Sequence, residues 1–208
     1  MKLMDKLINN IKFDKKYVLF SLILVILGII TGSLFIVILN STDKNLVIEY
    51  ISVFIDNIKN SSINNLDILK NTLITNYVII FILVIIGFSS FLFFINILIL
   101  FYKAFIIGFS LSSFILTFSI KGTILSIFYI LPHLIINILI FCLITAFTLK
   151  ISINMIRSII KKKEVNMRLY FNKYLSIIIL SIIILTITGL YESYIAPYLL
   201  ITIVNLII

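Results

Sequence analysis

The sequence predicts an all-α polytopic membrane protein, with about five transmembrane helices and an apolar segment after the last of them. Hydrophobic residues make up 62% of the 208 residues and charged residues only 12%, whereas soluble domains carry about 25% charged residues. Several uncharged runs also reach the roughly 20 residues that a helix needs to cross a bilayer. With a mean hydropathy of +1.27, the chain has too few polar groups to cover a water-facing surface. We therefore expect a single integral membrane domain over residues 1–208.

Five apolar segments of crossing length follow one another along the chain. We expect transmembrane helices at residues 17–39, 77–100, 104–120, 123–149 and 174–190. The fourth segment is long and contains Pro132, which predicts a kink or a tilt. The apolar tail at 191–208 leaves too few residues after Pro197 to cross again, so we predict an interfacial or re-entrant segment.

The distribution of charge predicts the orientation in the membrane. Thirteen of the seventeen Lys and Arg residues lie in the arm at 1–16, in the turn after residue 100 or in the segment at 150–173. Because Lys and Arg concentrate in cytoplasmic loops, we place the N-terminus in the cytoplasm and residues 40–76 outside. The net charge of +9 then reflects topology, and no nucleic-acid partner is expected. The arm has the pattern of a basic amphipathic helix that lies on membrane lipid, and the lysines at 161–163 favour lipid contact too.

The segment at 40–76 is the sizeable extracytoplasmic part of the predicted topology. Apolar residues recur at helical spacing from Val47 to Ile58, and a second apolar helical pattern follows residue 62. We predict a helical hairpin. One interpretation is that it packs on the spans or lies on the lipid surface. The other is that it docks an extracytoplasmic partner through Tyr50, Phe54 and Ile58.

Small residues line two of the predicted spans. Gly28 and Gly32 are four residues apart in the first span, and Ala104, Gly108 and Ser112 repeat at the same spacing in the third. Such stripes let helix backbones approach each other closely in a membrane. They predict either packing between helices of this chain or contact with a span of another protein, a homo-oligomer included.

Two ionisable side chains are expected near the membrane interior, His133 and Glu192. Such groups are costly in a bilayer and serve as functional hypotheses. The simpler interpretation is a neutral His133 that is hydrogen-bonded to a carbonyl freed by Pro132. The simpler interpretation of Glu192, which is flanked by Tyr191 and Tyr194, is a carboxylate at the membrane boundary that is hydrogen-bonded within its own protein.

The sequence offers little for catalysis. A structural or catalytic zinc ion needs three or four protein ligands, and the chain has one His and one Cys. All three aspartates outside the N-terminal arm lie between the predicted spans, so paired intramembrane carboxylates are not expected, and glycine-rich phosphate-binding motifs are absent from the sequence. We therefore expect no metal, no cofactor and no enzymatic activity.

Four short segments carry a family resemblance. They are residues 27–33, 102–109, 131–133 with Pro132 and His133, and 191–197 with Tyr191, Glu192, Tyr194 and Pro197. The last is the most specific, because a Glu–Tyr–Pro cluster after the last full span is unusual. Together they resemble the stage II sporulation protein M family of spore-forming Firmicutes. The abundance of Ile, Lys and Asn further suggests a clostridial source.

The resemblance implies a role in forespore engulfment during sporulation. Family members sit in the mother-cell membrane at the septum and are thought to anchor two peptidoglycan hydrolases, stage II sporulation proteins D and P. The implied function is thus a membrane scaffold for peptidoglycan remodelling. The alternative is a small permease or a membrane subunit of a transport system, with Pro132 and Glu192 near a translocation path. The scarcity of charge within the spans favours the scaffold.

Overall fold

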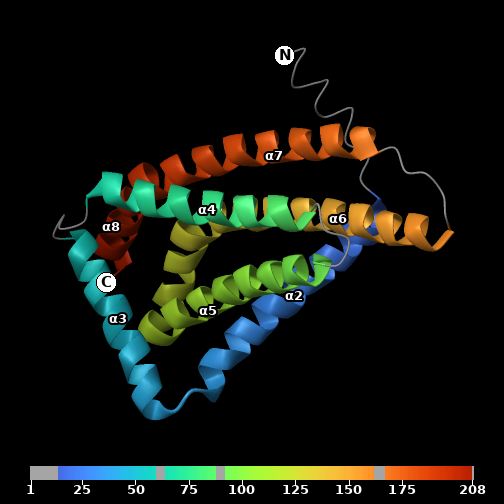
Figure 1. The fold of residues 1–208 in the computed structure, drawn as a ribbon. Helices are drawn as coiled ribbons and strands as arrows, with labels where there is room; N and C mark the ends of the chain where they lie inside the picture. Colours follow the sequence, from blue (N-terminus) through green and yellow to red (C-terminus); the bar gives the residue numbers. More distant parts are fainter. Residues whose placement is uncertain (1–13, 60–63, 88–91, 162–166, 208) are drawn as a thin grey trace.

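The fold consists of helices throughout the described part of the chain. The computed structural model describes residues 14–59, 64–87, 92–161 and 167–207. In these ranges lie α2 (Lys15–Ile38), α3 (Ser41–Lys59), α4 (Asn65–Gly87), α5 (Phe93–Leu125), α6 (Leu131–Lys161), α7 (Met167–Leu190) and α8 (Ala196–Ile207). The π-helices η1 (Ser126–Ile130) and η2 (Tyr191–Ile195) join α5 to α6 and α7 to α8 (Figure 1). The predicted all-α class is confirmed.

Four continuous helical stretches are long and apolar enough to cross a membrane. They are Lys15–Ile38, Asn65–Gly87, Phe93–Ile160 and Asn172–Asn205. The third stretch folds back on itself: its two halves, α5 and α6, are joined by a hydrogen bond that Asn96 Nδ2 donates to Thr148 Oγ1 over 2.7 Å. Within the described ranges, α2, α4, α5, α6 and α7 therefore run back and forth through one bundle (Figure 1). This arrangement confirms the prediction of a polytopic membrane protein.

The structure corrects the predicted boundaries of the second and third spans. The segment 77–100 is not one span, since α4 ends at Gly87 and α5 begins at Phe93. The second helix expected in the outer hairpin is the first part of α4. The predicted turn at 101–103 lies inside α5, so Lys103 is a helix residue. Hydropathy predicts the boundary between these spans at the wrong place. Residues 88–92 carry no charge, whereas Lys103 is the only charged residue between residues 71 and 120 and therefore resembles a loop residue.

The chain reverses near the end of α5, close to the predicted border between the third and fourth spans. Ser119 has φ 53° and ψ −128°, a conformation uncommon for residues other than glycine. Gly122 follows, and a Cβ there would collide with the carbonyl oxygen of Phe114. The reversal therefore needs glycine at this position.

The structure describes one of the two basic segments that are predicted to be cytoplasmic. Because α6 continues to Lys161 and α7 begins at Met167, most of the predicted basic segment at 150–173 is helical. Residues 1–13 of the predicted arm, and most of the lysine run at 161–163, lie outside the described residues.

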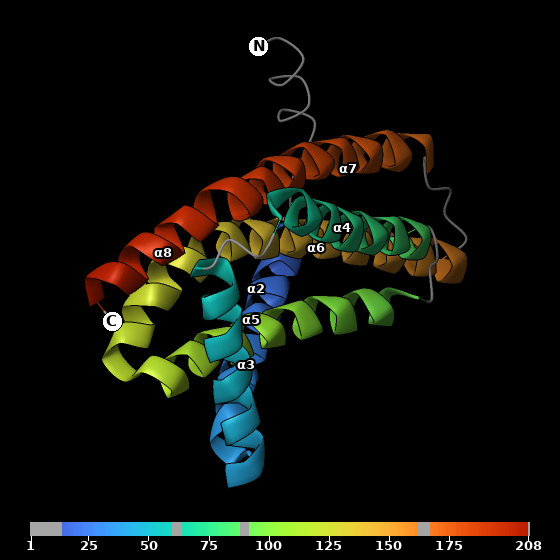
Figure 2. The same cartoon turned by 90° about the vertical axis from the view of Figure 1, so that its left-hand side faces the viewer.

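Each proline is the second residue of an α-helix that follows a π-helix. Pro132 follows η1 and Pro197 follows η2. A proline ring clashes with the carbonyl four residues earlier, and the wider π-helical turn accommodates that clash. The tail after Pro197 forms α8, whose buried Leu200 and Val204 pack in one cluster with residues of α3. Figures 1 and 2 show α3 and α8 at the same end of the bundle.

Helices α2 and α5 pack in parallel with their backbones in close contact. A Cβ added to Gly28 would lie 2.6 Å from the Cβ of Ala104, and one added to Gly32 would collide with the carbonyl oxygen of Phe105. Both glycines on α2 thus face α5 with no space for a side chain.

The stripe on α5 completes this contact. A Cβ added to Gly108 would collide with the carbonyl oxygen of Ile29, and Ser33 Oγ donates to the carbonyl oxygen of Gly108 over 3.2 Å. Ser112, one turn further along α5, is half-buried. The structure therefore places Gly28, Gly32, Ala104 and Gly108 in packing within this chain.

We predict that Gly32→Ala destabilises the protein by about 1–3 kcal/mol, because overpacking forces the two backbones apart. The matched control is Gly189→Ala in α7, where the added Cβ would lie 3.1 Å from the flexible end of Leu73. Since alanine forms helices better than glycine by about 1 kcal/mol, the control should be neutral or slightly stabilising. Thermal unfolding of both variants in detergent checks this, and equal melting temperatures would contradict it.

Candidate functional site

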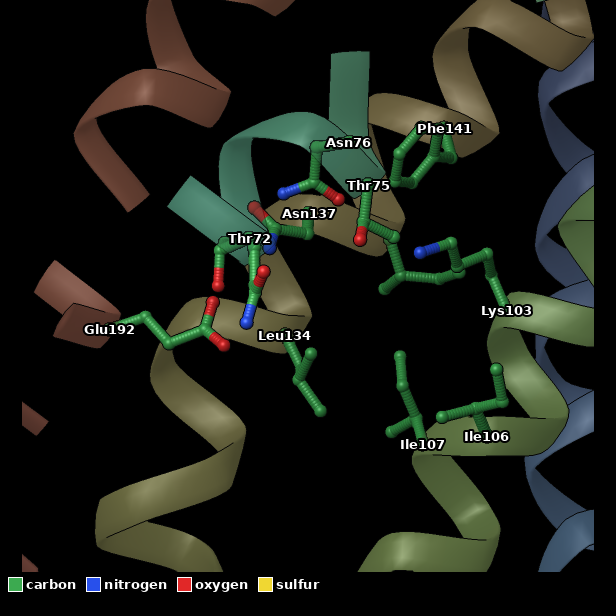
Figure 3. Close-up of a pocket in the computed structure, with 12 residues that line it drawn as sticks. Thr72, Thr75, Asn76, Lys103, Ile106, Ile107, Leu134, Asn137, Phe141 and Glu192 are labelled. Atoms are coloured by element: carbon green, nitrogen blue, oxygen red, sulfur yellow. The ribbon is translucent and has the colours of Figure 1, made fainter. Parts of the chain in front are cut away.

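A polar cavity of about 280 Å³ opens between α4, α5, α6 and η2 (Figure 3). It contains one cationic and one anionic side chain. Its lining residues are Asn71, Thr72, Thr75 and Asn76 of α4, Lys103, Ile106 and Ile107 of α5, Leu134, Asn137, Ile138 and Phe141 of α6, and Glu192 of η2. We call this space the polar cavity.

Lys103 enters the polar cavity from α5. Asn96, Lys103 and Ile107 lie on one stripe of α5 that faces α6, beside the small-residue stripe that faces α2. The Nζ atom of Lys103 lies 5.6 Å from the centroid of the Phe141 ring on α6, within the range of a cation–π interaction. The close contact between α2 and α5 therefore fixes the side from which this ammonium group enters the bundle.

Glu192 enters the cavity from the opposite side, on η2. Its carboxylate lies beside the Thr72 hydroxyl of α4, and Figure 3 shows the two groups pointing toward each other. Glu192 and Lys103 line the same cavity from different sides (Figure 3). They form no direct ion pair. The ion pair found among the described residues joins Lys150 Nζ to Asp14 Oδ2 over 3.0 Å.

Hydrogen bonds between helices hold the walls of the cavity in register. Thr188 Oγ1 of α7 donates to Asn137 Oδ1 of α6 over 2.6 Å. The hydroxyls of Tyr77 on α4 and Thr186 on α7 are 2.8 Å apart. The bond between Thr188 and Asn137 is buried. Since buried polar contacts favour one arrangement of the helices, the cavity belongs to a well-defined part of the bundle.

An apolar groove of about 600 Å³ lies beside the polar cavity, between α3 and the corner formed by α5 and η1. Its aromatic lining comes from Tyr50 and Phe54 of α3, Phe109 and Phe114 of α5, and Tyr129 of η1. Ile106, Leu134 and Glu192 line both spaces. We call this second space the apolar groove; Glu192 stands at its border with the polar cavity.

The outer residues predicted to bind a partner lie in two different environments. Tyr50 is 77% exposed, and the Phe54 ring lies 6.3 Å from the ring of Tyr129; both line the apolar groove. Ile58 is only 5% exposed and packs with residues of α8 and η1. The prediction that Ile58 presents an outer contact is therefore corrected: its helical spacing marked the buried face of α3.

The Pro132–His133 step lies next to the segment around Glu192. His133 is 5% exposed, and its ring lies 6.3 Å from those of both Tyr129 and Tyr191. No described residue gives Nδ1 of His133 a hydrogen bond. Tyr194 is exposed whereas Pro197 is buried, so the residues of the Glu–Tyr–Pro cluster do not share one surface.

The described residues contain no group of three or more His, Cys, Asp or Glu side chains able to hold a metal ion. The polar cavity instead offers an ammonium group, a carboxylate, amides and hydroxyls. Groups of this kind bind polar ligands by hydrogen bonds and charge.

Lys103 and the polar residues of α4 are not identified as cavity residues by the sequence pattern. Lys103 interrupts an apolar run, which predicts a loop, and Thr72, Thr75 and Asn76 fall within the predicted outer hairpin. Their spacing of three and four residues, which places them on one helix face, was a usable signal. Glu192, a candidate from the sequence, lines the cavity.

The fold and the cavity define a polytopic helical membrane protein with opposite charges inside its bundle. The family model described as Stage II sporulation protein M matches residues 21–197, so the chain belongs to this family and is a sporulation-related membrane protein. The resemblance noted in four segments is thereby confirmed. No curated protein and no solved structure matches the chain.

We predict that Thr72→Val destabilises the protein by about 1–3 kcal/mol, because it puts a methyl group in place of the polar neighbour of the Glu192 carboxylate. The matched control is Thr75→Val, one turn further on α4, which lines the same cavity but leaves the Thr72 hydroxyl beside Glu192 in place. Thermal unfolding in detergent measures both variants. Equal losses of stability would show that the contact with Glu192 is not the cause.

Proposed function

We propose that the protein is a non-catalytic membrane scaffold for forespore engulfment. In this proposal it lies in the mother-cell membrane at the sporulation septum and anchors the peptidoglycan hydrolases, stage II sporulation proteins D and P. The single observation that carries the proposal is the aromatic edge of the apolar groove on α3, where Tyr50 is exposed and Phe54 is half-buried. Membership of the family supplies the process in which such a surface would act.

The position of α3 supports docking at this surface. Helix α3 lies across the end of the bundle (Figure 2), where a partner can reach it without entering between the crossing helices. The groove next to it is large and rich in aromatic side chains. Aromatic anchors in desolvated pockets dominate many protein–protein interfaces, so this edge suits a partner segment that buries an apolar side chain.

The charge distribution supports an extracytoplasmic position for this surface. Lys103 lies inside α5 and no longer counts as a loop charge. Twelve of the other sixteen Lys and Arg residues still belong to the segments at 1–16 and 150–173. By the positive-inside rule these segments are cytoplasmic, which puts α3 on the side of the cell wall, where peptidoglycan hydrolases act.

We predict that replacing both Tyr50 and Phe54 by Ser reduces co-purification of the two hydrolases from sporulating cells at least tenfold, while membrane insertion is unchanged. The matched control is Val53→Ser, which changes an exposed apolar residue of α3 outside the groove lining. Undiminished recovery of the hydrolases with the double variant would overturn the role of the groove.

Point variants are preferable to deletion of the outer segment. Removing residues 46–75 would take away the first part of α4 with Thr72, and so would disturb the bundle as well as α3. The substitutions on α3 leave the crossing helices intact.

The polar cavity supports a second candidate, the small permease or transport subunit. Charged residues within a bundle often line a path for ions or solutes, and Lys103 and Glu192 have that position. Loss of solute flux in a Glu192→Gln variant reconstituted in vesicles would favour transport. We favour the scaffold because the other described cavity-lining residues are neutral.

A further inference from the structure

The polar cavity holds two opposite charges that do not neutralise each other by contact. Lys103 and Glu192 enter from different helices on different sides (Figure 3), and neither belongs to the ion pair found among the described residues. The ammonium group of Lys103 has the Phe141 ring as a partner, and Glu192 has the Thr72 hydroxyl. Each therefore keeps charge that a further group can compensate.

Charge in the interior of a membrane bundle is costly unless it is paired. A ligand with a single negative charge would compensate Lys103 and leave Glu192 without an opposite charge, and a cation would do the reverse. A neutral ligand that carries both charges compensates the two residues at once. The arrangement therefore favours a ligand with an ammonium group at one end and an anionic oxygen group at the other.

We propose that the polar cavity binds a small zwitterion, whose anionic group contacts Lys103 and whose ammonium group contacts Glu192. This site adjoins the apolar groove at Glu192 but does not include Tyr50 and Phe54, which are assigned to protein partners, and it goes beyond the proposed scaffold function.

The rest of the lining matches this ligand chemistry. Between the charged ends, Thr75 and Asn76 of α4 and Asn137 of α6 offer hydroxyl and amide groups, while Ile107 and Leu134 present apolar surface. A short aliphatic link between the two charged groups of the ligand fits such a wall. The volume of about 280 Å³ lies near the lower end of ligand pockets in proteins, so the ligand is small.

The position of Glu192 on η2 is a second, independent indication of a binding site. π-Helical turns inside helices occur frequently at functional sites. Here η2 precedes Pro197 and carries Glu192 to the border between the polar cavity and the apolar groove. The irregular turn thus presents the carboxylate where ordinary helix packing would place an apolar side chain.

Two sources supply the same zwitterionic chemistry. One is a free solute of the amino-acid type. The other is the headgroup of phosphatidylethanolamine, in which a short aliphatic link also joins an anionic phosphate to an ammonium group. For the lipid, the apolar groove is continuous with the cavity through Ile106, Leu134 and Glu192 and has space for acyl chains.

The first arm of the test uses free solutes and the full chain purified in detergent. Binding of glycine, β-alanine and γ-aminobutyrate is measured by calorimetry, together with the single-charge analogues butyrate and propylammonium. We expect at least one zwitterion to bind at least tenfold more tightly than either analogue. The second arm uses nanodiscs and native mass spectrometry, in which the headgroup source predicts retention of phosphatidylethanolamine over phosphatidylglycerol.

Four single variants and one double variant connect binding to the two charges. Lys103→Met and Glu192→Gln should each weaken binding at least tenfold in the arm that shows it. The matched controls are Lys121→Met and Glu49→Gln, which change exposed charges outside the cavity lining and should leave binding unchanged. The double exchange Lys103→Glu with Glu192→Lys should restore binding, because a zwitterion can enter in the reverse orientation.

The proposal is overturned if neither arm detects a zwitterion on the folded wild-type protein, or if the single-charge analogues bind equally well. Weakening by the control variants as large as that by Lys103→Met would also overturn it. The comparison of ligands on the wild-type chain does not depend on the folding of any variant. Since hydrolase recovery is not measured here, failure of this proposal leaves the scaffold function untouched.

Discussion

The close parallel contact between α2 and α5 is the constraint on which the rest of the bundle depends. Gly32 and Gly108 bring each backbone against a carbonyl oxygen of the other helix, so the two helices cannot rotate or slide without collision. In a membrane, where lipid tails are as apolar as the helices, such packing is a main source of association. Because the stripe at Ala104 and Gly108 faces α2, the adjacent stripe with Lys103 has to face α6 and the polar cavity.

The two prolines determine the path of the backbone on the other side of the cavity. Each proline forces a wider turn before it, and η1 and η2 are these turns. They lie close together, as the ring distances from His133 to Tyr129 and Tyr191 show. As a result, Glu192 borders both the polar cavity and the apolar groove. A ligand in the cavity and a partner in the groove would therefore contact the same helical turn.

The site divides into parts with different degrees of predictability. Gly28, Gly32 and Gly108 could be predicted as packing residues, because spacing along a helix is a local property. Glu192 could be singled out because a carboxylate next to an apolar span is rare. Lys103 could not be assigned to the cavity, since a charge in an apolar run is equally compatible with a loop. Ile58 was misassigned because helical spacing identifies an apolar face without showing what covers it.

The sequence by itself determined the helical membrane class and the family, since composition and a few local motifs carry both. Only the tertiary structure decided where the second helix ends, which face of α3 is buried and which charges meet. These properties depend on contacts between residues far apart in the chain, such as Thr72 with Glu192 and Asn96 with Thr148. Hydropathy averages over neighbours in sequence, and it therefore contains no information about such pairs.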